Sequence, residues 1–156
     1  MKKIFLTLTL TLPLLLVILI FSGCSDDITE GAIQSLKFTT VDNSKRSGIT
    51  EQRFVIIKDA AAWNALWAEH ARNDPLMPIP PIDFSKDMVL GVFLGTRGNT
   101  CFSVTIESVE QVAQQRLIVR YREVKSGQVC SPAETQPLHL IYLSSSVLPV
   151  EFVAQQ

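Results

Sequence analysis

The second half of the chain consists of short apolar runs separated by gaps that are too short to hold a helix. Between residues 88 and 154 these runs are MVLGVFLG, CFSVTIESV, QQRLIVRYREV, PLHLIYLSS and PVEFVA. A parallel crossover connection needs a dozen or more residues, so we predict that neighbouring strands are antiparallel. This spacing favours a β-sheet fold over a helical one.

One of these runs also indicates which side of the sheet meets solvent. In LIVRYREV, Leu117, Val119 and Tyr121 alternate with a face that carries Arg120 and Arg122. This alternation is typical of a sheet with one wet side. We therefore predict that Arg120 and Arg122 belong to an exposed protein-binding surface.

Two further strands are predicted nearer the N-terminus. LKFTTV (residues 36–41) alternates apolar and polar residues, and RFVIIK (residues 53–58) is almost continuously apolar. A continuous apolar run indicates burial on both faces, so we predict that residues 53–58 form a central strand. Together with the later runs, this gives about seven strands.

A single helix is predicted after Asp59, whose side chain can cap the sequence AAAWNALWAEHA. Trp63, Leu66, Trp67 and His70 fall on one face of that helix. We expect this face to pack on the sheet, the alternative being a ligand platform of two tryptophans. His70 lies in the last turn, where its ring suits the negative end of the helix dipole, and we predict a structural cap. The predicted fold class is α+β, with one main helix packed on an antiparallel sheet.

A proline-rich arm, NDPLMPIPPIDFSKD (residues 73–87), ends this helix. Proline lacks a backbone donor and fixes φ near −65°, so the arm should be extended and should stay outside the sheet. A segment that is already ordered loses less entropy on binding. We predict that Pro78, Pro80 and Pro81 contact a protein partner, with a plain spacer as the alternative.

The first 23 residues resemble a bacterial lipoprotein signal. MKK is followed by an uncharged run, residues 4–21, and then by Ser-Gly before Cys24. Cys24 is therefore predicted to be lipidated and to become the new N-terminus, the alternative being an uncleaved anchor helix. Several acyl chains would hold the protein on the membrane. Ser25 in place of aspartate favours the outer membrane over the inner one.

Behind this signal we predict a tether (residues 24–35) and one domain (residues 36–156). Removing residues 1–23 takes away two lysines and no acid, which changes the net charge from −1 to about −3. A weakly acidic chain has no dominant basic face, so we predict no nucleic-acid partner.

Two cysteines remain when Cys24 is set aside. In an oxidising compartment, Cys101 and Cys130 can close a loop of about 30 residues, worth about 3 to 4 kcal/mol in the chain-entropy model. Buried free thiols are the alternative. No C-x-x-C or H-x₃-H spacing accompanies them, so neither a metal nor another cofactor is predicted.

The sequence offers one weak candidate for catalysis. His139 lies within a predicted strand and Ser144 follows it closely, but no G-x-S-x-G elbow presents the serine. We therefore predict no catalytic residue. A hydrolase or small-molecule binder that uses His139 and Ser144 is an alternative.

Three pieces of the chain together resemble the PrcB C-terminal domain family, which is named after a lipoprotein subunit of a protease complex. These pieces are W-x-x-L-W (63–67), P-x-D-F (81–84) and V-L-G-V-F-L-G (89–95), and the similarity extends over about residues 53–153. The resemblance implies a non-enzymatic accessory role in a cell-surface complex. It brings no catalytic residues, and Cys101 stands where relatives often have glycine, which agrees with a Cys101–Cys130 bridge in some members.

These expectations describe an accessory protein of the bacterial cell envelope. It would be anchored in the membrane by lipid, carry no chemistry of its own, and bind another envelope protein, with a protease as one candidate. A protease inhibitor that presents the proline arm as a rigid loop is a further alternative.

Overall fold

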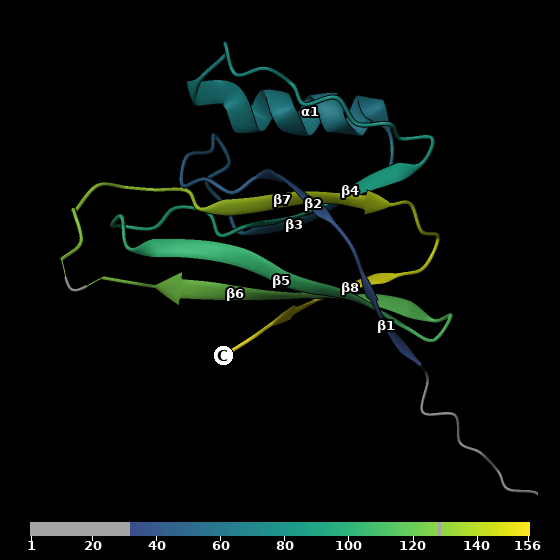
Figure 1. Cartoon of the computed structure of the whole chain (residues 1–156). Helices are drawn as coiled ribbons and strands as arrows, with labels where there is room; N and C mark the ends of the chain where they lie inside the picture. The colour runs from purple at the N-terminus through teal and green to yellow at the C-terminus, as the bar shows by residue number, and fades with distance from the viewer. Residues whose placement is uncertain (1–31, 128) are drawn as a thin grey trace, which may run out of the picture.

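The computed structural model of the chain, described over residues 32–127 and 129–156, has three layers (Figure 1). A helix lies on one face of a four-stranded sheet of order β2-β7-β4-β3, here called the helix-side sheet. A second sheet of order β1-β5-β6-β8, the outer sheet, packs on its other face. The strands are β1 (Ile33–Leu36), β2 (Thr39–Asp42), β3 (Arg53–Ile57), β4 (Asp87–Phe93), β5 (Phe102–Val112), β6 (Arg116–Lys125), β7 (Leu138–Ser144) and β8 (Val150–Ala154).

The predicted α+β class with one main helix is confirmed, but the sheet arrangement differs from the prediction. Eight strands form two sheets, where the sequence suggested about seven strands in one. The run LKFTTV accounts for part of the difference, because it breaks at Lys37 and Phe38. Its first residue, Leu36, ends β1 in the outer sheet, and its second half, residues 39–41, belongs to β2 in the helix-side sheet. β1 begins at Ile33, inside the segment predicted as the tether.

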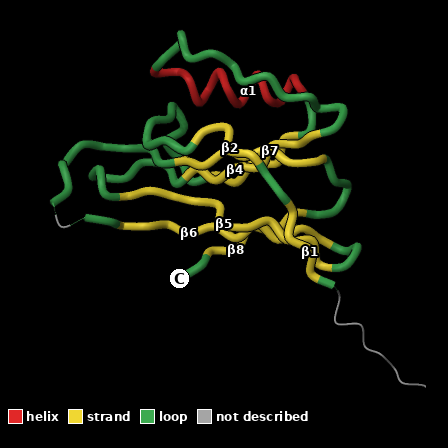
Figure 2. Tube along the Cα trace, in the orientation of Figure 1, coloured by secondary structure: helices red, strands yellow, loops and turns green. Residues whose placement is uncertain are grey.

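Two further strand predictions were wrong. β8 pairs with β6 in parallel, because the loop of residues 145–149 carries the chain from the helix-side sheet across to the outer sheet (Figure 2). β3 is an edge strand and not a central one. Its continuous apolar run has another cause: Val55 packs under the helix, while Phe54 stacks on Phe152 at the rim of the outer sheet, 5.0 Å between ring centroids.

The two faces of the helix-side sheet carry two separate cores. On β4, Met88, Leu90 and Val92 belong to the core between the sheets, called the inter-sheet core. Val89 and Phe93 belong to the core under the helix, called the helix-side core. All five side chains are almost completely buried, which explains why this strand reads as an unbroken apolar run.

The helix α1 (Ala60–His70) follows the sequence prediction closely. The Asp59 carboxylate accepts a hydrogen bond from the Ala62 amide at 2.8 Å and caps the first turn. The buried residues of the helix are the predicted stripe of Trp63, Leu66, Trp67 and His70. The chain then tightens into the 3₁₀ turn η1 (Ala71–Asn73) before the proline-rich arm begins.

Candidate functional site

The proline-rich segment of residues 74–86, called the proline arm, runs back over α1 (Figure 2). Both indoles of the helix hold it: Trp63 Nε1 donates to the Pro80 carbonyl at 3.1 Å, and Trp67 Nε1 donates to the Met77 carbonyl at 3.4 Å. Three of its side chains pack against the helix-side core, namely Met77, Ile82 and Phe84. The arm is therefore a fixed element of the fold that stays outside both sheets.

The opposite side of the arm faces solvent. Leu76 is 90% exposed and Ile79 is 50% exposed. Pro78 and Pro81 are exposed as well, whereas Pro80 is half-buried against the helix. Apolar side chains held outward on an ordered backbone suit contact with another protein, because little entropy is lost on binding.

A tight turn ends the arm before β4. The Asp83 carboxylate accepts hydrogen bonds from the Ser85 hydroxyl at 2.5 Å and the Ser85 amide at 3.1 Å, and lies 3.0 Å from Lys86 Nζ. These donors, with the Ser85 hydroxyl first, stabilise the charged form and lower the pKa of Asp83 to about 2. The turn therefore keeps its ionised cap over the whole physiological range.

The loop between β2 and β3 closes over the C-terminal end of the helix. The Gly48 amide donates to the His70 carbonyl at 2.7 Å, and Ser47 Oγ lies 3.1 Å from His70 Nδ1. Gly48 is required there, because a Cβ atom would lie 2.2 Å from the Glu69 carbonyl oxygen. The loop thus satisfies one of the free carbonyls that every helix end presents.

His70, predicted as a structural cap, lies inside the helix-side core, where its ring contacts Ser47 and Asp42. Its side chain is fully buried, and Nε2 lies 3.0 Å from Asp42 Oδ2. This contact is an ion-pair distance with poor direction, so Nε2 forms no hydrogen bond within the described part of the chain. His70 therefore joins the end of β2 to the end of the helix.

Asp42, Ser47 and His70 are the residue types of a serine hydrolase triad. In this structure they join the end of β2, the loop between β2 and β3, and the end of the helix, and this cluster is called the latch. Ser47 is only 3% exposed, and its Oγ accepts a hydrogen bond from the Ile49 amide at 3.0 Å. A nucleophile needs access to substrate, which a serine buried to this extent lacks. Sequence reasoning missed this cluster, since Asp42 and Ser47 stand in a polar loop with no recognisable spacing.

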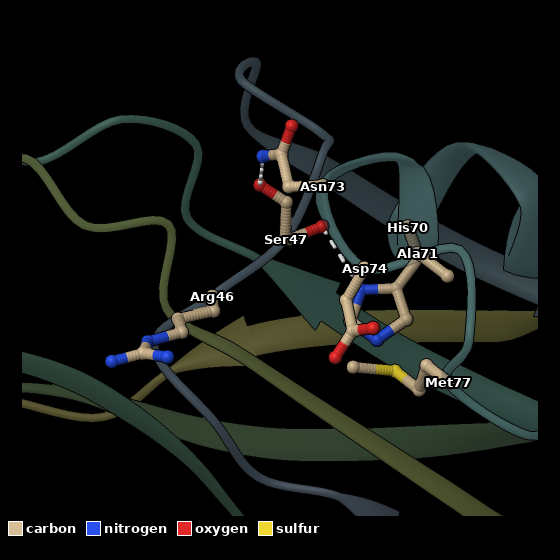
Figure 3. Close-up of a pocket in the computed structure, with 7 residues that line it drawn as sticks. All are labelled: Arg46, Ser47, His70, Ala71, Asn73, Asp74 and Met77. Atoms are coloured by element: carbon tan, nitrogen blue, oxygen red, sulfur yellow. Dashed lines mark hydrogen bonds between the residues drawn. The ribbon is translucent and has the colours of Figure 1, made fainter.

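Two hollows that share lining residues open beside this latch. Figure 3 shows the residues that line the smaller one. The smaller one, of about 170 Å³, is lined by Ser47, His70 and Asn73 among others. The larger one, of about 400 Å³, is wider open and reaches the arm itself. Both share three lining residues, Arg46, Asp74 and Met77. Together they form the candidate binding site, called the arm pocket.

His139, the other buried histidine, lies in the inter-sheet core and has both ring nitrogens engaged. The Ile106 amide donates to Nδ1 at 2.7 Å, beside the point where the register of β5 with β6 shifts. Nε2 must then carry the proton, and it lies 3.0 Å from Thr40 Oγ1. Burial lowers the pKa of His139, so the neutral ring is favoured.

This arrangement removes His139 and Ser144 as a catalytic pair. Nδ1 accepts a hydrogen bond and Nε2 is protonated, so no lone pair is available for a general base. The two residues also stand on opposite faces of β7, and five positions along a strand span about 16 Å. The structure therefore does not bring them together.

The predicted pair Arg120 and Arg122 lies on the outer face of the outer sheet. Arg120 Nε lies 3.0 Å from Glu110 Oε2, and Arg122 Nε lies 2.7 Å from Glu107 Oε1. The proline arm lies on the far side of the helix, so the three layers separate it from these arginines (Figure 1). One compact partner surface cannot contact both predicted regions at once.

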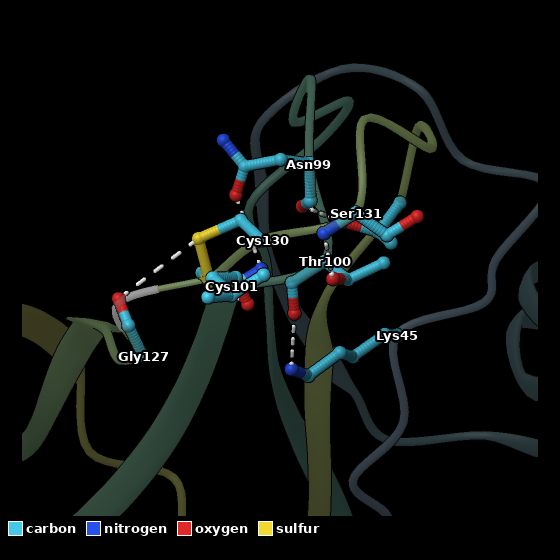
Figure 4. The surroundings of a disulfide bond; sticks show 9 residues. Lys45, Asn99, Thr100, Cys101, Gly127, Cys130 and Ser131 are labelled. Atoms are coloured by element: carbon cyan, nitrogen blue, oxygen red, sulfur yellow. Dashed lines mark hydrogen bonds between the residues drawn. A yellow bond between two sulfur atoms is a disulfide. The ribbon is translucent and has the colours of Figure 1, made fainter.

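The predicted disulfide is present. Cys101 and Cys130 are bonded, with 5.4 Å between their Cα atoms. The bridge fixes the loop that follows β6 to the start of β5, where Ser131 N donates to Thr100 Oγ1 (Figure 4). Lys45 Nζ reaches the same corner and donates to the Thr100 carbonyl at 2.6 Å.

Some predictions fall on residues 1–31, which lie outside the described part: the signal segment 1–23, Cys24 and most of the tether. Within residues 32–127 and 129–156, no helix is long and apolar enough to span a membrane. The same residues contain no cluster of three or more potential metal ligands.

Comparison with known proteins gives no assignment. No family model matches the chain, and neither a curated protein nor a solved structure matches it.

Proposed function

We propose that this chain is a non-catalytic, lipid-anchored protein of the bacterial cell envelope that binds another protein as an accessory subunit of a cell-surface complex. The resemblance to the PrcB C-terminal domain family makes a protease complex the first candidate. Lipidation at Cys24 would hold the chain on the membrane, with the outer membrane favoured.

One observation carries the protein-binding part of this proposal. The proline arm is tied to α1 through both indoles and three packed side chains, yet it holds Leu76 and Ile79 out in solvent. A rigid backbone with outward apolar side chains is the arrangement that favours association, because binding need not order it. A plain spacer would not need such anchoring.

Two observations support the absence of chemistry. The latch serine is buried and hydrogen-bonded, and His139 has no free lone pair. His70 Nδ1 lies within reach of Ser47 Oγ, but a hydroxyl on a residue only 3% exposed is closed to a substrate, and His139 cannot act as a base. We therefore place the function of this domain in binding.

The decisive experiment is affinity capture from the native membranes with a double variant, Leu76→Ser together with Ile79→Ser. The matched control is Val129→Ser. Val129 is 93% exposed, but it lies away from the arm, on the loop between β6 and β7 that carries Cys130 and is called the disulfide loop. We expect the double variant to lose a partner that wild type and control both retain. Equal capture by all three proteins would overturn the arm as the contact surface.

Two alternatives are separated by their own measurements. Arg120→Ala and Arg122→Ala test the outer sheet face, and loss of capture in these variants alone would move the interface there. A protease inhibitor would slow the turnover of envelope proteases when the full chain is added. The arm is packed along the helix and does not project as a free loop, so we expect no slowing.

A further inference from the structure

Two carboxylates from different elements of the chain line the larger hollow of the arm pocket. Asp42 stands at the end of β2 and Asp74 at the start of the proline arm. Within the described part of the chain, Asp74 forms no ion pair, and Asp42 pairs with the imidazole of His70 and accepts a hydrogen bond from the Ser44 hydroxyl at 3.2 Å. Arg46 also lines this hollow but forms no ion pair there within the described residues, so neither carboxylate has a lysine or arginine partner.

Apart from Ser44 and Arg46, the remaining residues that line this hollow are apolar, and one of them is aromatic. Trp67 contributes its indole, and Met77, Pro78 and Pro80 contribute the arm side. Lysine and arginine side chains have an apolar stem and a charged head, and they commonly lay the stem along such a surface. A cation near an indole face gains a further attraction.

The buried imidazole gives a second, independent observation. His70 Nε2 is enclosed and lacks a hydrogen-bond partner, and it lies 3.0 Å from the Asp42 oxygen. Ser47 Oγ already accepts from the Ile49 amide and can accept a second bond from His70 Nδ1. That tautomer would set a lone pair of Nε2 against the carboxylate, so the Ser47 hydroxyl donates to Nδ1 and Nε2 carries the proton that faces Asp42. Since Nε2 forms no hydrogen bond, the Asp42 carboxylate keeps lone pairs for a ligand N–H.

The basic side chains around the pocket do not neutralise it. Arg46 lines its mouth, but the guanidinium points away from Asp74 and His70 (Figure 3). Lys45 donates to the Thr100 carbonyl, and Arg72 lies 4.0 Å from Glu69. The site therefore stays open to a positive group from outside.

We propose that the arm pocket binds a lysine or arginine side chain of the partner protein, with the charged head between Asp42 and Asp74 and the stem along Trp67 and the arm. This inference rests on the proposed protein-binding function and names the chemistry of its recognition. It assigns the arm two roles: an outer face that contacts the partner surface and an inner face that covers one inserted side chain.

The test uses the full chain in detergent micelles, labelled with ¹⁵N at the tryptophan indoles. The probes are two capped tripeptides, acetyl-Gly-Lys-Gly-amide and acetyl-Gly-Glu-Gly-amide. We expect the lysine peptide to shift the Trp67 indole signal saturably, while the glutamate peptide leaves it unchanged. An equal response to both peptides, or no saturable response to the lysine peptide, would overturn the proposal.

Variants locate the binding site. Asp74→Asn should weaken binding of the lysine peptide about threefold or more, in line with the loss of an exposed charge pair. Glu134→Gln is the matched control, an exposed acid on the disulfide loop, and should bind as wild type does. Arg46→Gln should bind as tightly or more tightly, because a like charge at the mouth is removed. Unchanged affinity in Asp74→Asn would contradict this site.

The same variants separate this inference from the function on which it rests. Partner capture that is lost in the Leu76 and Ile79 double variant but normal in Asp74→Asn would keep the arm as the contact surface and overturn the pocket. Capture that is lost in Asp74→Asn while the Glu134→Gln control retains the partner supports both.

Discussion

The two buried histidines lie on opposite faces of the same sheet and differ in how completely their surroundings satisfy them. His139, in the inter-sheet core, has both ring nitrogens engaged by Thr40 and Ile106. His70, in the helix-side core, has one nitrogen engaged by Ser47 and one that faces Asp42 without a hydrogen bond. Burial alone therefore does not separate a structural histidine from one at a site. An unsatisfied atom next to a hollow does.

The largest expected effect tests whether the inter-sheet core is more closely packed than the helix-side core beneath the proline arm. Leu90→Ala should lower the free energy of unfolding by about 3 to 5 kcal/mol, because Leu90 is fully buried between the sheets. Met77→Ala, under the arm, should cost less than half as much, since Met77 is half-buried beside an existing hollow. Urea unfolding measures both, and equal losses would break the distinction.

The next effect concerns His139, whose two ring nitrogens both have hydrogen-bond partners. His139→Leu should cost about 1 to 3 kcal/mol, because the Ile106 amide loses its buried acceptor. Thr40→Ala is the milder companion variant, since it removes only the partner of Nε2 and Thr40 is itself exposed. A His139→Leu protein as stable as wild type would mean that this hydrogen bond contributes nothing.

The pH dependence of stability gives a third comparison. Burial lowers the pKa of His139 below its ordinary 6.5, so below that value the unfolded chain binds a proton that the folded chain resists. Stability should be fully present above pH 6.5 and should fall as the pH drops towards the folded-state pKa. His139→Gln should flatten this part of the curve. The pKa values of Glu69 and Glu107 are also lowered, but these groups change stability only below about pH 4.5. Their effect therefore falls in a different pH range from that of His139. An unchanged slope between pH 7 and 5 in the variant would contradict the assignment.

The smallest effect separates binding from folding at the arm pocket. Asp74→Asn should change the free energy of unfolding by no more than about 0.5 kcal/mol, because Asp74 is exposed and its side chain forms no ion pair within the described residues. Thermal or urea unfolding of the variant measures this directly. A loss above 1.5 kcal/mol would make Asp74 a structural residue and weaken its role as a free ligand group.

The sequence predicted those parts of the fold that depend on local chemistry. The Asp59 cap, the buried stripe of α1 and the termination of the helix by the proline arm follow from side chains a few positions apart. The Cys101–Cys130 bridge follows from the count of cysteines, once the chain is predicted to be exported and Cys24 is set aside. The helix features are set by residues close in the sequence, and the cysteine pair remains once Cys24 is excluded. Neither prediction needs the three-dimensional structure.

The features that were missed depend on long-range packing. An apolar run such as RFVIIK reads the same at the centre of a sheet and at an edge that is covered by a helix on one side and Phe152 on the other. The parallel pairing of β8 arises from a loop that changes sheets, and no residue in that loop signals it. Asp42 and His70 stand 28 positions apart in the sequence, so no local sequence pattern could reveal the latch or the arm pocket.

The most direct test of the central claim is site-specific photo-crosslinking of the full chain in its native membranes. A photoreactive residue is placed at Leu76 on the proline arm and, in a second protein, at the equally exposed Val129 on the disulfide loop. We predict a discrete crosslinked partner from position 76 and none from position 129. A partner that crosslinks from position 129 alone, or no partner from either position, would contradict the proposal that the arm is the binding surface.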